Sequence, residues 1–525
     1  MSQTKPGRCD YDVVIIGSGI GGLTAGAYLA KHGVRVLICE QNRKPGGCFA
    51  SFKRKGYTFD GGIRGCEDMG ILLPILRELD LLDRIDLRRS KLAYAFPDCF
   101  CPLEQMGDLE LIYDHLKKIF PRESNALDRI KKESIALCRV MDAFARAPNL
   151  MVEPLLGAVL KTPRWLIQHA SGLRGLKHLT GLLNIPIDEY LSTFVRDQNL
   201  IRLLSAGYRG NPAAFSMSFL CTMMDYYYPA RGGVQAIPNW LAKSILENGG
   251  EVRYGTLVEN ILVEDGRATG VSVKGGERIR ARFIINNGDI RRTFSEMVPS
   301  GAVPEEYARS LQQSNVSESV FSVYLGVDMP PEEIPTQGCG HVFLMPTYET
   351  LDLNEIDSNP DFYRRTLIMM MFPTLHDLAL APKGKSVVIL QCSASIRSLN
   401  RWGTRKGKPT KKYGANKKEI ATQLIANAEK LIPDLSKRIE LQIESTPFTL
   451  QRYTLNSDGA AVGWTYHPRE TFRQGFKGLF GSSNTPIRNL YQVGHWTMSP
   501  GGAPAGLMTG KIVSSIVRHR LRWGV

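Results

Sequence analysis

The sequence predicts an α/β protein in which a discontinuous Rossmann-type domain is joined to a mixed sheet-plus-helix domain and a helical lid. The first observation is a strand, a Gly-rich turn, a helix and a second strand near the N-terminus. The second is a helix with a small β-meander between residues 226 and 300, and the third is a strand, a Gly-rich loop and a helix near the C-terminus. Since these pieces can complete one open sheet and its covering helices, we expect one domain built from three segments.

The composition is that of a globular chain. Hydrophobic residues make up 43% and charged residues 22% of the 525 residues, which excludes a disordered or fibrous protein. The 66 basic residues exceed the 51 acidic ones by 15, so anionic partners are favoured. The sequence has no nucleic-acid-binding motif, and we therefore expect no nucleic-acid partner.

The first segment has the order of a βαβ unit. Tyr11–Ile16 is rich in β-branched residues and predicts a strand buried on both faces. Gly17–Gly22 has the pattern Gly-x-Gly-x-x-Gly, and Leu23–His32 has helical spacing. Val34–Cys39 predicts the second strand. This order is the context in which the glycine pattern binds a dinucleotide.

Four residues of this unit have expected roles toward the cofactor. Gly17 permits the tight turn, Gly19 lets the backbone approach a pyrophosphate, and Gly22 lets the helix pack near the strand. The helix N-terminus offers free N–H groups and the positive end of its dipole to the phosphates. Glu40 follows Gly22 by 18 residues and is placed to accept hydrogen bonds from a ribose hydroxyl.

The residues after this unit indicate which dinucleotide binds. Arg43, Gly46 and Gly47 are followed by the pair Gly61-Gly62. This arrangement resembles the extended motif of FAD-binding oxidoreductases, in which the Arg and the Gly pair fold over the adenosine and pyrophosphate. The sequence has no second Gly-x-Gly-x-x-Gly between a strand and a helix, so we expect one FAD and no separate NAD(P)H domain.

The middle segment is expected to rejoin the same sheet. Arg231–Val234 opens a helix predicted at Gln235–Glu247, and Asp265-Gly266 predicts a hairpin turn between two strands. Arg280–Asn287 predicts the strand that returns to the sheet. Val258 lies where FAD enzymes of this type present backbone groups to the adenine; alternatively it is only a residue of the strand core.

The C-terminal segment predicts a second anion site. Leu490–Val493 predicts a strand that Gly494 ends, and a Gly-rich loop then leads into a helix. We expect free N–H groups near Ala505 and Gly506 to stabilise the charge that the N1–C2=O edge of a flavin ring gains on accepting a hydride.

Three blocks of the chain, Gly17–Gly62, Arg231–Asp289 and Asn489–Gly510, resemble the phytoene desaturase, carotenoid cis-trans isomerase and retinol saturase group of FAD enzymes. The resemblance runs in order along nearly the whole chain. It implies an FAD-dependent oxidoreductase that acts on C–C or C=C bonds of a long apolar isoprenoid of carotenoid or retinoid type. Many members place an acid after the strand-ending Gly to hold the ribityl chain, whereas this chain has His495, which either hydrogen-bonds a hydroxyl or is a structural polar residue.

The sequence indicates the reaction less specifically than the cofactor. Because a flavin supplies the reactivity, no protein nucleophile or metal is needed, and the sequence has neither a Ser-His-Asp set nor a zinc motif. Desaturation is the leading hypothesis. Isomerisation, saturation, an amine-oxidase-like reaction and non-catalytic prenyl-lipid carriage remain as alternatives. The candidate catalytic residues are Arg64, Arg452, Tyr453, His495 and Trp496.

The three blocks also predict the domain boundaries. We expect the FAD-binding domain at 10–98, 226–300 and 482–525, the substrate domain at 301–481, and a helical lid or membrane-facing region at 99–225.

The sequence also predicts where the protein resides. Apolar side chains interleaved with Lys, Arg and His between Leu150 and Leu183 favour docking on a membrane surface; the alternative is a buried pair of lid helices. The N-terminus lacks the apolar core of a signal peptide, and the ten Cys residues are scattered, so we expect reduced thiols and a cytoplasmic, peripheral membrane protein.

Overall fold

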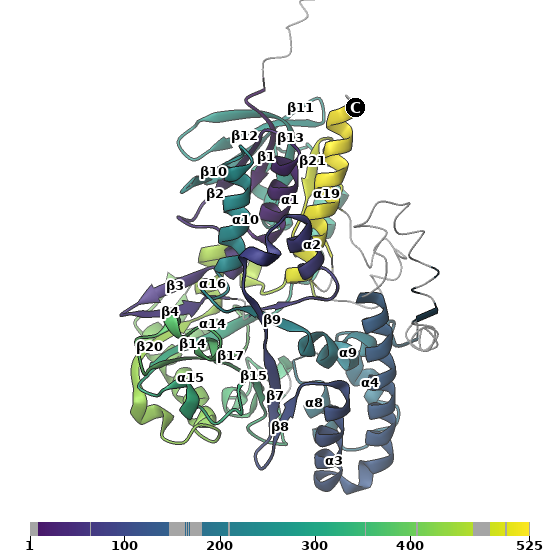
Figure 1. Cartoon of the computed structure of the whole chain (residues 1–525), viewed down its shortest axis with the longest axis vertical. Coiled ribbons are helices and arrows are strands. Elements are labelled where there is room, and N and C mark those ends of the chain that lie inside the picture. The colour runs from purple at the N-terminus through teal and green to yellow at the C-terminus, as the bar shows by residue number, and fades with distance from the viewer. Residues whose placement is uncertain are drawn as a thin grey trace, which may run out of the picture.

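The computed structural model describes eight stretches of the chain and four isolated positions: residues 9–62, 65–145, 181–207, 210–351, 353–405, 408–465, 483–498 and 501–523, with 163, 165, 167 and 168. Figure 1 shows the Rossmann-type domain at one end of the long axis and a second sheet at the other end. The lid helices lie beside the second sheet, and the C-terminal helix runs along the Rossmann-type domain.

The Rossmann-type sheet has the strand order β10-β2-β1-β13-β12-β11, and β21 pairs with β13 as well. β1 is parallel to β2 and β13, and its burial on both faces explains its continuous apolar run. The N-terminal, middle and C-terminal segments therefore share one sheet, as predicted. The strands are β1 Tyr11–Ile16, β2 Val36–Glu40, β10 Glu251–Tyr254, β11 Val258–Glu264, β12 Arg267–Val273, β13 Arg278–Asn286 and β21 Leu490–Gln492.

Three helices, α1 (Ile20–Lys31), α10 (Ala236–Glu247) and α19 (Ala503–Trp523), share one hydrophobic core with this sheet. α19 lies so close to α1 that a Cβ atom on Gly510 would stand 2.5 Å from the backbone oxygen of Gly21. A Cβ atom on Gly506 would stand 2.7 Å from Ile20 Cγ2. Helices that touch at this distance need glycine, so both ends of the chain are locked together by residues without side chains.

The opposite face of the sheet is covered by the β11–β12 meander and by the segment after β13. Asp265 (φ 50°) and Gly266 (φ 69°) form the turn between β11 and β12, which confirms the hairpin that the sequence predicts. A π-helical turn, η5 (Thr293–Met297), packs into the same core.

The second sheet has the order β20-β14-β17-β16-β15-β7-β8. One face packs on helices α13 (Phe362–Arg365), α14 (Leu399–Trp402) and α15 (Lys412–Ala428). The strands are β7 Lys91–Ala95, β8 Phe100–Leu103, β14 Ser319–Val327, β15 Cys339–Leu344, β16 Ile368–Met371, β17 Ser386–Ala394 and β20 Ile439–Ser445.

The lid packs against the other face of this sheet. Its helices share a core with Phe343 of β15, with Met345 directly after β15, and with Met369 of β16. The lid helices are α3 Leu109–Ile119, α4 Ser124–Ala145, α7 Ile187–Ser192, α8 Gln198–Leu204 and α9 Ala213–Met224.

The domain boundary expected at residue 98 needs correction. β7 pairs in parallel with β15, and β8 pairs with β7, so residues 91–103 belong to the second sheet rather than to the Rossmann-type domain or the lid. The hairpin of β3 (Ser51–Arg54) and β4 (Tyr57–Asp60) also leans on the second sheet, because a Cβ atom on Gly326 of β14 would meet the Tyr57 ring at 2.7 Å.

Most of the segment 150–183, the expected membrane-docking region, lies outside the described residues. Of the described positions there, Ile167 is 79% exposed and Trp165 Nε1 donates to the backbone oxygen of Ala143 at 2.9 Å. Along the described parts of the chain, no helix combines the length and the apolar character needed to cross a bilayer.

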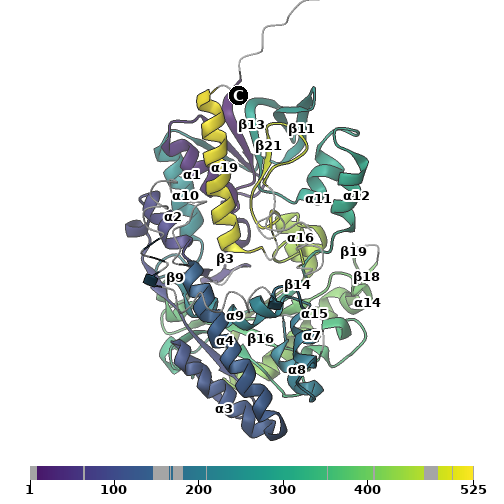
Figure 2. The ribbon, with the colours of Figure 1, turned by 90° about the vertical axis from the view of Figure 1, so that its right-hand side faces the viewer.

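The other helices and strands connect these layers. They are β5 Cys66–Glu67, β6 Leu87–Arg89, β9 Tyr226–Pro229, β18 Thr404–Arg405, β19 Lys408–Pro409, α2 Leu72–Glu78, α11 Ile290–Arg292, α12 Glu305–Gln313 and α16 Pro447–Thr454. Figure 2 shows α16 between the Rossmann-type domain and the second sheet.

The expectation of ten reduced thiols needs correction at Cys138. Cys138, in lid helix α4, is disulfide-bonded. This bond could not be predicted, because cysteine spacing alone does not reveal which residues meet in space.

The contact of α19 with α1 predicts a large effect from a small substitution. Gly510→Ala places a methyl group against the backbone of α1, and we expect the free energy of unfolding to fall by about 1–3 kcal/mol in urea denaturation. Gly414→Ala is the matched control, since Gly414 lies in α15 with open space around it, and there the change should be neutral or stabilising by up to about 1 kcal/mol. Equal stabilities of the two variants would contradict the close packing.

Candidate functional site

The glycine turn between β1 and α1 leaves no space for side chains. Gly17 has φ +90°, and its N–H donates to the backbone oxygen of Cys39 at 2.8 Å. A Cβ atom on Gly22 would stand 2.3 Å from the backbone oxygen of Gly17. Among the described residues no side chain caps the N-terminus of α1, so the first N–H groups of the helix remain available to an anion.

Asn287, directly after β13, lies inside this turn. A Cβ atom on Gly19 would stand 2.5 Å from Asn287 Nδ2, and one on Gly494 would stand 2.7 Å from Asn287 Oδ1. The Asn287 amide is therefore enclosed by glycines from both ends of the chain. The sequence predicts a strand that ends at Asn287 and no role for its side chain. Its position at the carboxyl end of a strand parallel to β1 is the signal that would have found it.

Glu40 is buried at the end of β2 and is already fully hydrogen-bonded. Its Oε2 accepts from Ser18 N at 2.8 Å and Ser18 Oγ at 2.7 Å, and its Oε1 accepts from Asn42 N at 2.8 Å and Asn42 Nδ2 at 2.9 Å. A carboxylate has about four acceptor positions. A ribose hydroxyl can therefore bind Glu40 only if the Ser18 hydroxyl or the Asn42 amide turns away.

The second glycine pair lies against the first turn. Gly46 has φ +126°, forms a β-bridge with Gly19, and donates its N–H to the backbone oxygen of Ser18 at 2.9 Å. Gly47 also has a positive φ, of 57°. Arg43 is exposed beside this pair. The segment expected to fold over the pyrophosphate thus adjoins the glycine turn.

Val258 begins β11 and is 3% exposed in the core beneath the meander. The chain just before it runs beside the end of β2, because Thr256 N donates to the backbone oxygen of Glu40 at 2.8 Å. Gly255 N likewise donates to the backbone oxygen of Asn42 at 3.0 Å. Val258 therefore lies near the expected adenosine end of the site, with its side chain in the core.

One of the two free N–H donors expected at the start of the C-terminal helix is already hydrogen-bonded. Gly506 N donates to the backbone oxygen of Gly502 at 3.1 Å, because Gly506 is already the fourth residue of α19. Its N–H is therefore not free, and its missing side chain instead permits contact with α1. Ala505, one residue earlier and buried, keeps the position of a free first-turn donor. Gly494 turns at φ +89°, and its N–H donates to Thr509 Oγ1 at 3.0 Å.

His495 is held between two glycines. A Cβ atom on Gly501 would stand 2.8 Å from His495 Cβ, and one on Gly463 would stand 2.6 Å from the backbone oxygen of His495. Burial lowers the pKa of His495 to about 4, so the imidazole is neutral at physiological pH. A neutral imidazole both donates and accepts a hydrogen bond, as binding to a flavin hydroxyl requires.

Trp496 does not fit the catalytic role that the sequence analysis gave it. Its side chain is 2% exposed, its Nε1 donates to Asn456 Oδ1 at 3.2 Å, and its ring packs edge-on against Trp464 at 5.0 Å. The tryptophan is a residue of the hydrophobic core beneath the β11–β12 meander.

Arg452 and Tyr453 lie at the end of α16 and are exposed. The backbone oxygen of Tyr453 accepts from Gln41 Nε2 at 3.1 Å and Asn42 Nδ2 at 3.2 Å, which joins α16 to the end of β2. These contacts use the main chain of Tyr453, and the catalytic role expected of the Arg452 and Tyr453 side chains stays a prediction. The fifth candidate, Arg64, lies outside the described residues.

A layer of aromatic side chains begins at Gly65. A Cβ atom on Gly65 would stand 2.4 Å from the Tyr226 ring. From there the ring centroids continue from Tyr226 to His341 at 5.8 Å, from His341 to Phe343 at 4.7 Å, and from Phe343 to Tyr94 at 5.0 Å. These rings lie between the lid and the second sheet.

The lid and the sheet are less closely packed at a small cavity of about 70 Å³. Apolar side chains dominate its wall, with one cationic side chain, and the lining residues are Arg202, Ser205, Ala206, Gly207, Leu351, Leu353, Thr366, Leu367, Met369 and Ser393.

Comparison with known families decides the nature of the site. Residues 20–518 match the family described as flavin containing amine oxidoreductase. The chain belongs to this family. FAD is its cofactor, and the chain is an FAD-dependent oxidoreductase, as the glycine motifs predict. The uncapped N-terminus of α1 and the glycine turn fit the pyrophosphate of this cofactor.

Relatives with named activities indicate which part of this family the chain resembles. The chain is 29% identical to a prolycopene isomerase of Daucus carota over 92% of this chain and 76% of that protein. It is 27% identical to an all-trans-retinol 13,14-reductase of Danio rerio over 97% of this chain and 86% of that protein. It is 23% identical to a 4,4'-diapophytoene desaturase of Methylomonas over 97% and 96%. The predicted resemblance to this group of FAD enzymes is confirmed.

Solved structures support the same fold. An oxidoreductase from Methanosarcina mazei aligns with a TM-score of 0.60 at 17% identity, over 96% of this chain and 99% of that one.

The neutral state of His495 predicts how stability responds to acid. Because the folded pKa is about 4 while a free histidine titrates near 6.5, protonation favours the unfolded state, and this stability is lost as the pH falls from about 6.5 to 4. His495→Gln should therefore lose less melting temperature than the native protein between pH 7 and pH 5. His519→Gln, at an exposed histidine of α19, should behave like the native protein. Equal acid sensitivity of His495→Gln and the native protein would argue against a buried neutral imidazole.

Proposed function

We propose that this FAD-dependent oxidoreductase acts on C–C or C=C bonds of a long apolar isoprenoid of carotenoid or retinoid type. The observation that carries the proposal is the aromatic layer between the lid and the second sheet, which starts at Gly65 beside the glycine-rich segment Gly61-Gly62. Flat ring faces suit a flat conjugated chain. The activities by which the relatives are named, on prolycopene, retinol and diapophytoene, support the same substrate class.

The residues of the chain position, desolvate and polarise the reacting centre. When bound, FAD supplies hydride exchange at its ring. The turn at Gly17–Gly22 and the first N–H groups of α1 would hold the pyrophosphate, and Glu40 would hold the ribose once the Ser18 hydroxyl or the Asn42 amide turns away. The N–H of Ala505 would stabilise negative charge on the flavin ring. The neutral imidazole of His495 binds a hydroxyl without adding charge to the site.

The aromatic layer would exclude water from the site. Phe343 is 1% exposed, His341 is 3% exposed and Tyr226 is 6% exposed. The flexible thioethers of Met217 and Met224, both buried in lid helix α9, can adapt to an elongated chain. A dry surrounding of this kind strengthens every electrostatic contact around a reacting carbon.

Product mass distinguishes the possible reactions. FAD-loaded protein is incubated with a polyene in liposomes, once with the flavin oxidised and once with it chemically reduced. We expect the oxidised form to give a product two mass units lighter if the reaction is the desaturation favoured by the sequence. An unchanged mass with altered absorbance indicates isomerisation, and a product two units heavier indicates saturation. All three outcomes support the substrate class. Reduction of the bound flavin by a primary amine, with no polyene product, would overturn it in favour of an amine oxidase.

We also propose that the protein docks on a membrane surface through residues 150–183. The mixture of apolar and cationic side chains there, the surplus of 15 positive charges and the insolubility of the substrate support this.

Sedimentation with liposomes tests the docking proposal. The native protein should sediment with anionic vesicles and be released by high salt. Trp165→Glu combined with Ile167→Glu should weaken sedimentation about tenfold, because each change places a charge in the headgroup layer. The control Leu246→Glu changes an exposed leucine of α10 in the Rossmann-type domain and should not alter sedimentation. Equal sedimentation of all three proteins would exclude this surface.

A further inference from the structure

Two buried carboxylates, one from each domain, meet at the turn that opens α10. Gly232 and Gly233 have φ angles of +81° and +60°. Asp377, which lies between η8 (Pro373–Leu375) and η9 (Leu378–Leu380) of the second domain, accepts from Gly232 N at 2.6 Å and from Gly233 N at 3.3 Å through Oδ2. Its side chain is 5% exposed. The second domain therefore holds the backbone of this turn directly.

Asp60, at the end of β4, holds the same turn from the other side. Its Oδ1 accepts from Ser51 Oγ at 2.8 Å and from Val234 N at 3.3 Å, and its Oδ2 accepts from the Tyr228 hydroxyl. Asp60 is 4% exposed. A Cβ atom on Gly233 would stand 2.9 Å from Asp60 Oδ1, so the carboxylate fills the space that a side chain would need.

The Gly232–Gly233 turn is also connected by hydrogen bonds to the segment around Gly46, which is expected to fold over the pyrophosphate. Gln235 Nε2 donates to the backbone oxygen of Pro45 at 2.8 Å, and Ser51 N donates to Gln235 Oε1 at 3.0 Å. Gly46, next to Pro45, donates its N–H to the backbone oxygen of Ser18 in the first glycine turn. A displacement of Gly232 and Gly233 would therefore reach the glycine turn through Gln235 and Gly46.

We propose that Asp60 and Asp377 are positioning residues, which hold the Gly232–Gly233 turn between the two domains and thereby keep the segment at Gly46 closed over the bound flavin. The inference rests on the binding of FAD at the Gly17–Gly22 turn. It does not depend on which polyene reacts.

The charge state of Asp60 makes this proposal measurable. Burial raises the pKa of Asp60 to about 6, partly offset by the hydrogen bonds from Tyr228, Ser51 and Val234, and the charge of Asp377 raises it further. On protonation, charge-assisted hydrogen bonds become neutral ones of about half the strength. For a loosening in which Asp60 stays buried, the turn should therefore be held less firmly as the pH falls through about 6.

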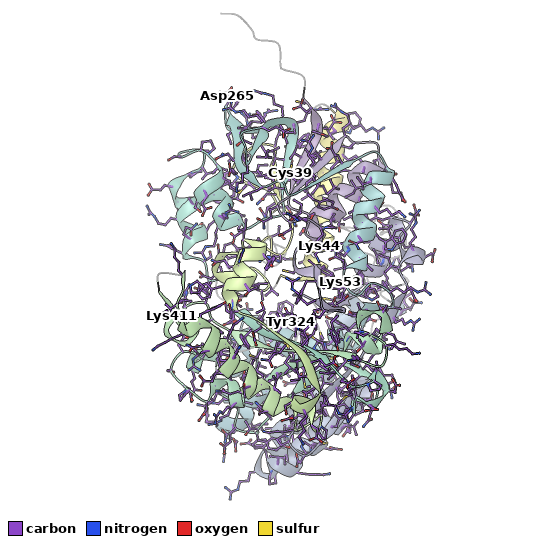
Figure 3. All side chains as sticks on the ribbon, turned by 90° about the vertical axis from the view of Figure 1, so that its left-hand side faces the viewer. Cys39, Lys44, Lys53, Asp265, Tyr324 and Lys411 are labelled. Atoms are coloured by element: carbon purple, nitrogen blue, oxygen red, sulfur yellow. The ribbon has the colours of Figure 1, made fainter. Side chains whose placement is uncertain are left out.

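The other titratable groups around Asp60 come from each packed element. Tyr228 of β9 carries a pKa raised well above its usual value by burial and by the charge of Asp60. His376, whose ring stacks on Tyr228 at 5.0 Å, has a pKa lowered to about 4 by burial and by Arg88. The charge of Asp60 also acts on Lys44 and Tyr324, which Figure 3 shows at the level where the two domains meet. The step expected near pH 6 is therefore assigned to Asp60.

The rate of flavin release tests the proposal. FAD-loaded proteins are diluted into buffers from pH 5 to pH 8, and release is followed by the rise in flavin fluorescence. The native protein should release flavin about tenfold faster at pH 5 than at pH 7.5, with a midpoint near 6. Asp60→Asn should be fast at every pH and show no midpoint. Asp377→Asn should be faster than the native protein but keep the step.

A matched control separates positioning from general capping. Asp197 accepts from Asn199 N at 2.8 Å at the start of lid helix α8, far from the turn in sequence. Asp197→Asn should keep the native release rate and the native step.

The stability of the flavin-free proteins separates positioning from a purely structural role. Because the folded pKa of Asp60 is raised, its ionisation costs stability as the pH rises from about 4 to 6. Asp60→Asn avoids this cost, so relative to the native protein it should be more stable at pH 7 than at pH 5, although it releases flavin faster at pH 7. A structural role alone would make stability and flavin retention fall together.

Tyr228→Phe provides a variant that keeps both carboxylates. The hydrogen bond from Tyr228 lowers the pKa of Asp60, so its removal should move the midpoint of release to higher pH. An unchanged midpoint, or native release by Asp60→Asn, would overturn the inference alone. A native protein that takes up no flavin would overturn the cofactor site together with it.

Discussion

The close approach of three backbone segments around the first glycine turn is the constraint on which the rest of the structure depends. Gly22 packs on the oxygen of Gly17, and Gly494 and Gly19 both stand against the Asn287 amide. These residues come from the beginning, the middle and the end of the chain. Any side chain at these glycines would separate the segments, so the discontinuous domain closes only because three distant stretches carry glycine or a small amide at the same place.

The helices extend this constraint through the domain. α19 contacts α1 through Gly506 and Gly510, which brings the C-terminal loop with His495 next to the first turn. The second domain is then oriented by few but buried contacts. The carboxylate of Asp377 reaches the turn at Gly232. The hydroxyl of Tyr324 in β14 donates to the backbone oxygen of Gly61 at 2.5 Å. The lid and the aromatic layer are thereby placed beside the segment that precedes Gly65.

Short sequence patterns correctly predicted the strands and turns that depend on neighbouring residues. β1 has the predicted bounds, and the turn at Asp265-Gly266 forms as expected, because β-branched runs and Asp-Gly pairs act over a few residues. The place of β7 beside β15 was missed, since these strands are some 240 residues apart and pairing at that distance leaves no local pattern. Asn287 and Ser18 were missed because short polar residues after strands are common. Trp496 was misplaced because sequence does not reveal which side of a loop faces the core. The free N–H assigned to Gly506 failed because the first residue of a helix sets which N–H groups are already bonded.

The central claim is that FAD binds at the first glycine turn, and titration of flavin-free protein with FAD tests it most directly. The native protein should quench flavin fluorescence to saturation at one FAD per chain. Gly22→Ala, which forces a methyl group against the oxygen of Gly17, should bind at least tenfold more weakly. Gly107→Ala, at a glycine with open space around it, should bind as the native protein does. Native affinity in Gly22→Ala would contradict the claim.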